Sequence, residues 1–362
     1  MAGSRTLGPA EGTRSGVLNL LVLVICAVAI YISCEWFVNA VEWLGKRLNV
    51  GTTAVGTILA AIGTALPESV VTFVAVVFGR GESAKDIGVG AAMGGPLALA
   101  TVAYGVTGLV MWSQRRARVR VPVGGPPPPQ RPPQQRPASD LGDTKKLARD
   151  QTWFLVIFVV KVVLGLVAFA IKTWLGLLFF AAYAVYFWRE LRADDEDHGH
   201  ELEPLKLQRT RAIPATWAVV LQTLLTLAVI FVASQLFVHQ LGVIGPMIGL
   251  PAAVTAVLLS PIATELPETM NAIIWVRQGK TRLALANISG AMMIQATVPS
   301  GLGLLFTPWR FDHALLAAGL VTMAAIGYLL VLLRMGRLNA RTLTAAAGFY
   351  AIFAVSLFFV DL

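Results

Sequence analysis

The longest stretch of this chain without a charged side chain lies between Arg211 and Glu265 and contains 53 residues. A helix that crosses a membrane needs roughly 20 apolar residues, so this stretch is long enough for two crossings. Only 14% of the 362 residues are charged, whereas soluble domains carry about 25%. A soluble chain of this composition would leave extensive apolar surface in contact with water. Together these features predict an all-α, polytopic integral membrane protein.

The apolar segments predict ten membrane-spanning helices. They cover residues 17–44, 50–79, 86–113, 151–170, 173–191, 212–240, 243–276, 283–306, 314–333 and 342–360. The loops that follow odd-numbered spans hold 22 Lys and Arg residues, whereas the termini and the other loops hold 6. Because basic residues concentrate on the cytoplasmic side, we expect a plasma-membrane protein with both termini outside. The net charge of +9 follows from these loops and does not indicate binding to nucleic acid.

An internal repeat with an offset of 200 residues organises the chain. Leu59–Gly95 and Leu259–Gln295 align without gaps and share 12 of 37 residues, including Thr-x-Leu-Pro-Glu. Each copy holds five predicted spans, and because five is odd the second copy is inverted in the membrane, as in many secondary transporters. The predicted units are an outer tail (1–16), a first five-helix repeat (17–191), a cytoplasmic loop (192–211) and a second five-helix repeat (212–362). The first repeat includes a Pro-rich cytoplasmic linker (114–150).

Both repeats carry a Pro-Glu motif inside an apolar helix, GTALPE at 63–68 and ATELPE at 263–268. A proline within a helix lacks an N–H group and clashes with the carbonyl group four residues earlier. We therefore expect the second helix of each repeat to be broken, with the carbonyl oxygens of Gly63 and Ala263 released. A released carbonyl in hydrocarbon must find another partner, and a cation is a suitable one.

The side chains of the two motifs add oxygen ligands. Thr64 and Glu68 are four residues apart and share a helix face, as do Thr264 and Glu268, while Glu265 falls close to that face. Oxygen-only sites suit hard cations such as Ca²⁺ or Na⁺. Each acidic residue at mid-membrane costs on the order of 2.5–3.5 kcal/mol, so a purely structural proline kink is the weaker interpretation. The sequence predicts a cation site centred on the two paired glutamates.

The motifs, their inverted repetition and the ten spans resemble the calcium/cation antiporter superfamily, specifically the membrane region of sodium/calcium exchangers. The hallmark of that region is GTSLPE in both repeats. The resemblance implies a transporter, not an enzyme, that exchanges Ca²⁺ for Na⁺ or H⁺ by alternating access without a permanently bound cofactor. It implies that Glu68 and Glu268 are central ligands beside Thr64 and Thr264. It also implies contributions from the following helices at Ala91, Gly95, Ala291 and Gln295.

The chain departs from the hallmark in an unequal way. Ala65 and Glu265 replace the motif serines, and Gly95 and Gln295 stand where an Asn or Asp ligand is usual. The first repeat thus loses side-chain oxygens, whereas the second gains a carboxylate. Because three neighbouring carboxylates cannot all stay ionised without a cation, we hypothesise that Glu265 carries a proton during part of the cycle. A monovalent cation/proton antiporter and a non-transporting sensor or scaffold remain as alternatives.

Other polar residues within the spans leave their roles open. Lys161 is expected to pair with an acid of a neighbouring helix or to serve a structural role. Glu35 and Glu42 either line the ion pathway or lie at the membrane rim. The acidic segment Asp194–Glu203 is expected to be a solvated loop. The expected partners are the lipid bilayer and inorganic cations, and the sequence does not predict an oligomeric state.

Overall fold

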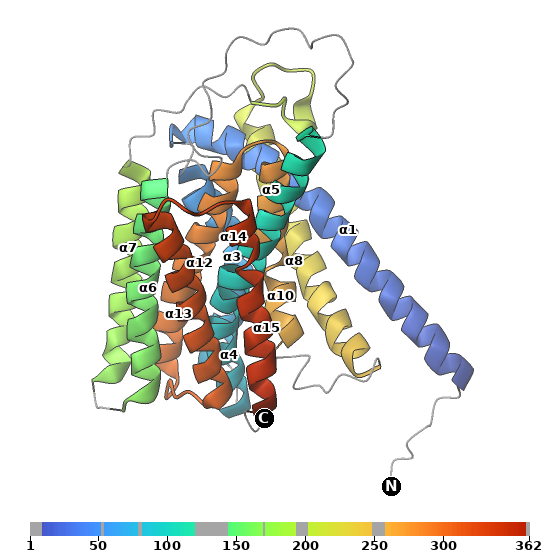
Figure 1. Ribbon diagram of the computed structural model, residues 1–362. Helices are drawn as coiled ribbons and strands as arrows, with labels where there is room; N and C mark the ends of the chain where they lie inside the picture. The colour runs from blue at the N-terminus through green and yellow to red at the C-terminus, as the bar shows by residue number, and fades with distance from the viewer. Residues whose placement is uncertain are drawn as a thin grey trace.

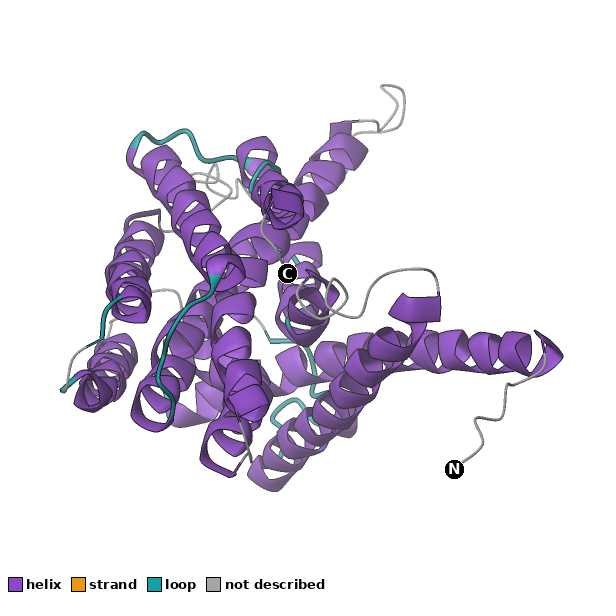
Figure 2. Ribbon diagram, turned by 90° about the horizontal axis from the view of Figure 1, so that it is seen from below, coloured by secondary structure: helices purple, strands orange, loops and turns teal. Residues whose placement is uncertain are grey.

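The computed structural model describes residues 9–51, 54–78, 82–119, 144–168, 171–192, 202–247 and 258–359. All regular elements within these ranges are helical (Figure 2). This confirms the prediction of an all-α protein.

The helices of both repeats overlap the predicted spans. The first repeat contains α1 (Pro9–Leu48), η1 (Val55–Ala60), α3 (Ala61–Phe73), η2 (Val74–Phe78), α4 (Glu82–Ala98), η3 (Leu99–Ala103), α5 (Tyr104–Val119), α6 (Thr144–Leu166), η4 (Lys172–Leu175) and α7 (Gly176–Arg192). The second contains α8 (Thr216–Met247), α10 (Ser260–Thr264), α11 (Leu266–Arg277), α12 (Thr281–Phe306), α13 (His313–Arg334), α14 (Ala340–Thr344), α15 (Ala347–Ser356) and η7 (Leu357–Phe359). The short helix η5 (Lys206–Gln208) precedes α8.

Five of the helices that the structure describes are both long enough and apolar enough to cross a membrane. They are Gly16–Leu48, Val89–Arg115, Thr216–Gly245, Thr281–Phe306 and His313–Arg334. The remaining predicted spans correspond to shorter helices, to helices divided by irregular turns, or to α6, which has 23 residues but is less apolar. The structure therefore supports several membrane crossings, and the total of ten stays a prediction.

The two Pro-Glu motifs have different backbones. In the second repeat α10 ends at Thr264, Glu265 lies in a turn, and α11 begins at Leu266. Pro267 thus falls in the first turn of α11, where a missing N–H group has no cost because it would lack an intrahelical partner anyway. In the first repeat α3 continues through Pro67, and the irregular backbone lies in the flanking π-helical segments η1 and η2. The expected break is present at the second motif and absent at the first.

Helix α12 forms the centre of the bundle and is buried along most of its length. Helices α3, α4, α6, α7 and α11 all pack against it. Helices α1 and α8 pack along one another at one side of the bundle (Figure 1), and the N-terminal part of α1 projects beyond it (Figure 2). Apolar side chains such as Val24 of α1 and Leu224 of α8 are more than half exposed, as expected for surfaces in contact with lipid.

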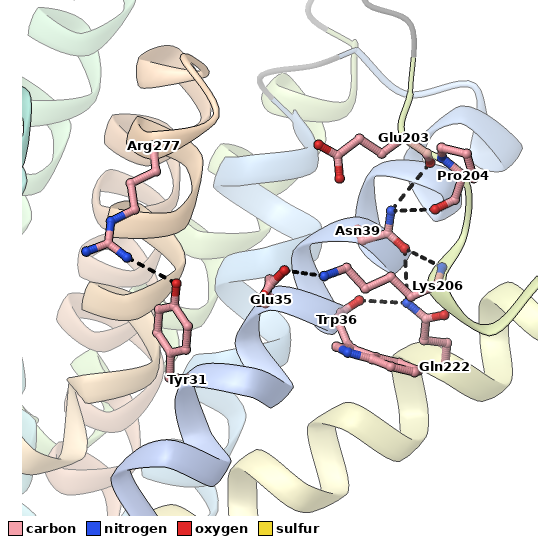
Figure 3. Close-up of polar contacts among 9 residues, drawn as sticks. All are labelled: Tyr31, Glu35, Trp36, Asn39, Glu203, Pro204, Lys206, Gln222 and Arg277. Atoms are coloured by element: carbon pink, nitrogen blue, oxygen red, sulfur yellow. Dashed lines mark hydrogen bonds and ion pairs between the residues drawn. The ribbon is translucent and has the colours of Figure 1, made fainter. Parts of the chain in front are cut away.

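Polar contacts join α1 to the segment that leads into α8 (Figure 3). Lys206 forms an ion pair with Glu35. The Asn39 side chain donates a hydrogen bond of 3.4 Å to the carbonyl oxygen of Glu203. The Gln222 side chain of α8 donates to the carbonyl oxygen of Trp36 at 2.8 Å. These contacts hold α1 and α8 together as a pair and place Glu35 in a peripheral ion pair.

A second set of contacts ties α1 to the end of α11. The Glu42 carboxylate accepts bonds from the Lys280 ammonium at 2.5 and 2.6 Å and from the Trp275 indole at 2.8 Å. Arg277 donates to the hydroxyl of Tyr31 at 3.1 Å (Figure 3). Glu42 is therefore an anchor between α1 and α11, which answers the question that its sequence position left open.

Candidate ion-binding site

Glu268 lies in the first turn of α11 and is completely buried. Neither oxygen of its carboxyl group makes a hydrogen bond of good geometry within the described residues, although the Thr64 side chain lies near it. The positive end of the α11 dipole favours a negative charge at this position. That field is a weak substitute for direct partners, since burying an unpaired carboxylate carries a large desolvation penalty. The geometry suits a bound cation.

Thr64 of the first repeat faces the Glu268 carboxyl group of the second. Its hydroxyl donates to the carbonyl oxygen of Ala60 at 3.1 Å, so the hydroxyl oxygen keeps lone pairs for another partner. Thr64 is only 1% exposed. The structure therefore brings one predicted ligand of each repeat together at the interface between the repeats.

The other predicted backbone and hydroxyl ligands lie in different surroundings. Thr264 donates to the carbonyl oxygen of Pro261 at 3.1 Å and is partly exposed, whereas Ala263 is buried. Gly63 lies against α1 and α8, where an added Cβ atom would come within 2.9 Å of the Phe37 ring. Close helix packing thus accounts for a glycine at this position.

Glu265 and Gln295 form a buried pair across the turn between α10 and α11. The Gln295 amide donates a hydrogen bond of 2.8 Å to the Glu265 carboxylate, and both side chains are at most 2% exposed. A Cβ atom added to Gly95 would lie 2.7 Å from Oε1 of Glu265 and closer still to Oε1 of Gln295. The missing side chain of Gly95 in the first repeat therefore leaves the space that the larger side chains of the second repeat occupy.

Two asparagines that the sequence analysis did not select extend this polar region. Asn287 of α12 donates to the carbonyl oxygen of Glu268 at 3.2 Å. Its own side-chain oxygen and both amide atoms of Asn271 lack hydrogen-bond partners within the described ranges, although both residues are fully buried. The repeat offered a signal, because the positions 200 residues earlier hold Val71 and Ile87. A polar residue opposite an apolar repeat partner marks a position where the two halves differ in chemistry.

The Glu68 backbone lies within α3, but its side chain lies outside the described part of the structure. Ligation by Glu68 therefore stays a prediction. Among the described residues no three His, Cys, Asp or Glu side chains gather in one place. Ala91 and Ala291 lie in α4 and α12 and provide no side-chain oxygen. The polar groups brought together here are carboxyl, hydroxyl and amide groups, and their oxygens are the ligands that hard cations prefer.

Known proteins resemble this chain along most of its length. CaxA of Alkalimonas amylolytica, which is named as an antiporter, is 26% identical over 89% of this chain and 92% of its own. The inner membrane protein YrbG of Escherichia coli K12 is 23% identical over 82% of both chains. The sodium-calcium exchanger NCX_Mj, in a structure soaked with Na⁺ and Sr²⁺, has the same fold. That comparison has a TM-score of 0.69 at 17% identity and covers 94% of this chain and 99% of the exchanger.

The profile of one protein family covers both predicted repeats, with gaps only at the termini and between the halves. It matches residues 18–191 and 218–360, and therefore includes α3 with Thr64 as well as α11 with Glu268. The chain belongs to the sodium/calcium exchanger protein family.

Proposed function

We propose that this protein is a secondary antiporter that exchanges Ca²⁺, or a similar hard cation, for Na⁺ or H⁺ by alternating access. The observation that carries the proposal is the Glu268 carboxyl group, which is fully buried and makes no hydrogen bond of good geometry within the described ranges. Family membership and the antiporter name of CaxA support the same activity. We place the protein in the plasma membrane with both termini outside, on the basis of its loop charges.

The substrate site in this proposal lies between the two repeats. Glu268 and Thr64 come from different repeats and face one another. Sites at repeat interfaces near mid-membrane are typical of inverted-repeat transporters, because movement of one half against the other exposes them to either side in turn. Glu68 is the proposed second carboxylate, and Thr264 and the carbonyl oxygens of Gly63 and Ala263 complete the proposed ligand set.

Glu265 is the proposed site of proton coupling. Its carboxylate accepts a hydrogen bond from Gln295 and occupies the space beside Gly95. When the metal ion leaves, the Glu265 carboxylate and the other two carboxylates of the proposed site repel one another. Protonation of Glu265 removes this repulsion, which favours a proton as the counter-ion. The same arrangement would serve a monovalent cation/proton antiporter, and the measurements below separate the two.

The test uses purified protein in sealed proteoliposomes. A Na⁺ gradient or a pH gradient is imposed, and uptake of radioactive Ca²⁺ is measured for the wild type, Glu268→Gln and Glu35→Gln. We expect gradient-driven uptake in the wild type and Glu35→Gln, because Glu35 is in a peripheral ion pair, and none in Glu268→Gln. Uptake by Glu268→Gln at the wild-type rate would show that the site is wrongly assigned. Binding titrations with Ca²⁺, Mn²⁺, Na⁺ and K⁺ identify the transported ion. Binding of monovalent ions alone would favour a monovalent cation/proton antiporter.

A further inference from the structure

Lys161 lies in α6 and is completely buried. Its ammonium nitrogen is 2.8 Å from the carbonyl oxygen of Ala92 in α4 and 4.4 Å from the centre of the Phe158 ring. No carboxylate of the described ranges forms an ion pair with it. Within the described ranges the lysine is held by a backbone oxygen and an aromatic face and not by the acid that the sequence analysis offered as one alternative.

Pro96 explains why the Ala92 carbonyl oxygen accepts this bond. Pro96 lies inside α4, and a proline cannot donate to the carbonyl group four residues earlier. The Ala92 oxygen thus loses its helical partner, and because Ala92 is only 1% exposed the oxygen needs a partner within the protein. The Lys161 ammonium satisfies that oxygen, and released carbonyls of this kind bind cations in broken-helix transporters.

The packing of three helices allows the lysine to reach α4. A Cβ atom added to Gly319 of α13 would lie 3.0 Å from Val162 and 3.1 Å from Met93. These two residues follow Lys161 and Ala92 directly in sequence. The glycine therefore lets α13 lie close to both helices, and the indole of Trp309 further fixes α6 by donating to the Lys161 carbonyl oxygen at 3.1 Å.

The proposed ion site lies against the same turn of α4. Gly95 is three residues after Ala92 and is in close contact with the carboxylate of Glu265 and the amide of Gln295. The Lys161 ammonium is therefore bonded to the Ala92 carbonyl group, and the Glu265 carboxylate lies against Gly95 on the same turn of α4. The Cα atoms of this turn lie about 2.3 Å from the helix axis. The two charges are on the order of 10 Å apart in that arrangement.

We propose that Lys161 is a tethered cation that balances one of the three carboxylates of the transport site, Glu68, Glu265 and Glu268. This inference rests on the proposed function. With the ammonium in place the three carboxylates and the lysine carry a net charge of −2, which one divalent cation neutralises. The lysine occupies a proline-released carbonyl that a mobile monovalent cation would otherwise fill, and it tunes the affinity of the site for its substrate.

The sign of the effect separates charge from structure. At the effective dielectric constant of about 20 that suits protein sites, a fixed positive charge about 10 Å away weakens binding of a monovalent cation by roughly tenfold and binding of a divalent cation by roughly a hundredfold or more. Removing the charge should therefore strengthen binding, whereas simply damaging α4 should weaken it. Few structural lesions improve the affinity of a site, so the direction of change is informative.

The experiment measures Ca²⁺ binding by calorimetric titration of the purified, detergent-solubilised protein. Lys161→Met removes the charge, and Lys161→Arg keeps it. Pro96→Ala restores an N–H group for the Ala92 carbonyl oxygen, so that the double variant Lys161→Met/Pro96→Ala lacks the charge but retains a partner for that oxygen. Pro96→Ala alone is the matched control. We expect roughly a hundredfold tighter Ca²⁺ binding or more in Lys161→Met and in the double variant, and wild-type affinity in Lys161→Arg and Pro96→Ala.

Two results would overturn the inference. Wild-type affinity in the double variant would mean that the lysine only satisfies the Ala92 oxygen or is uncharged. Weaker binding in Lys161→Met that the double variant restores would assign the lysine a purely structural role. If Lys161→Met does not fold, the double variant still decides. A wild-type protein that binds none of the tested cations would instead contradict the proposed function itself.

Discussion

The Pro-Glu motif of the first repeat lies inside a continuous α-helix, whereas that of the second lies at a break between α10 and α11. The difference extends to the side chains. The second repeat contributes Glu265, Glu268 and Gln295, while the first contributes Thr64 and leaves an empty position at Gly95. Among the described side chains, the second repeat supplies most of these polar groups, and Gly95 of the first repeat supplies space for two of them. A repeated sequence can thus build a site that is shared unequally between its copies.

The strongest challenge to this comparison is to remove the central carboxylate of each half in turn. We expect Glu68→Gln and Glu268→Gln each to weaken Ca²⁺ binding by roughly a hundredfold or more, because loss of one partner of a buried ion pair costs about 3–5 kcal/mol. Calorimetric titration checks this, and Glu35→Gln serves as the peripheral control. Wild-type binding in Glu68→Gln would make the asymmetry complete, with the second repeat supplying every essential carboxylate.

The empty position of the first repeat can be filled. Gly95→Ala should lower both thermal stability and Ca²⁺ affinity, because overpacking a buried contact costs about 1–3 kcal/mol and the new methyl group meets Glu265 and Gln295. Gly90→Ala is the matched control in the same helix, since nothing lies within 4 Å of a Cβ atom there. Shortening the opposing side chain in Gly95→Ala/Gln295→Ala should recover stability. Equal behaviour of Gly95→Ala and Gly90→Ala would refute the complementary packing.

The extra carboxylate of the second repeat can be neutralised without changing its shape. Glu265→Gln should retain Ca²⁺ binding but lose the dependence of Ca²⁺ uptake on an imposed pH gradient, because the amide cannot carry the transported proton. Uptake into proteoliposomes at several external pH values measures this. Since protons compete with Ca²⁺ for an ionised carboxylate, the wild type should bind Ca²⁺ less tightly as the pH falls, and the variant less steeply so. An unchanged pH dependence would remove Glu265 from the coupling step.

The smallest expected difference concerns the two motif hydroxyls. Thr64→Val should weaken Ca²⁺ binding by about fivefold, in the range of the 0.5–1.5 kcal/mol that one hydrogen-bonding group contributes. Thr264→Val should have less effect, because Thr264 is partly exposed whereas Thr64 is buried and faces Glu268. Titrations of both variants, with melting temperatures to confirm folding, provide the comparison. A larger loss in Thr264→Val would reverse the assignment of the two hydroxyls.

Sequence reasoning reached the helical fold and the family because both depend on local patterns, and it selected Glu268 as a candidate ligand for the same reason. Apolar runs of a set length predict helices in a membrane, and a carboxylate inside such a run is costly wherever it lies. It also predicted equal breaks at both motifs, which was wrong for the first. The position of a proline predicts where a helical hydrogen bond is missing. The surrounding packing decides whether the helix is interrupted at the proline or becomes irregular at the neighbouring π-helical turns.

By itself, the sequence determined that the chain crosses the membrane several times and contains the same helical unit twice, since hydrophobicity and repetition are properties of the chain alone. Only the tertiary structure decided which groups meet. It brought Thr64 to Glu268 from 204 positions away, placed Gly95 against Gln295, and joined Lys161 to a carbonyl group of α4. These contacts depend on how close whole helices approach, and that distance is set by the combined shape of many side chains.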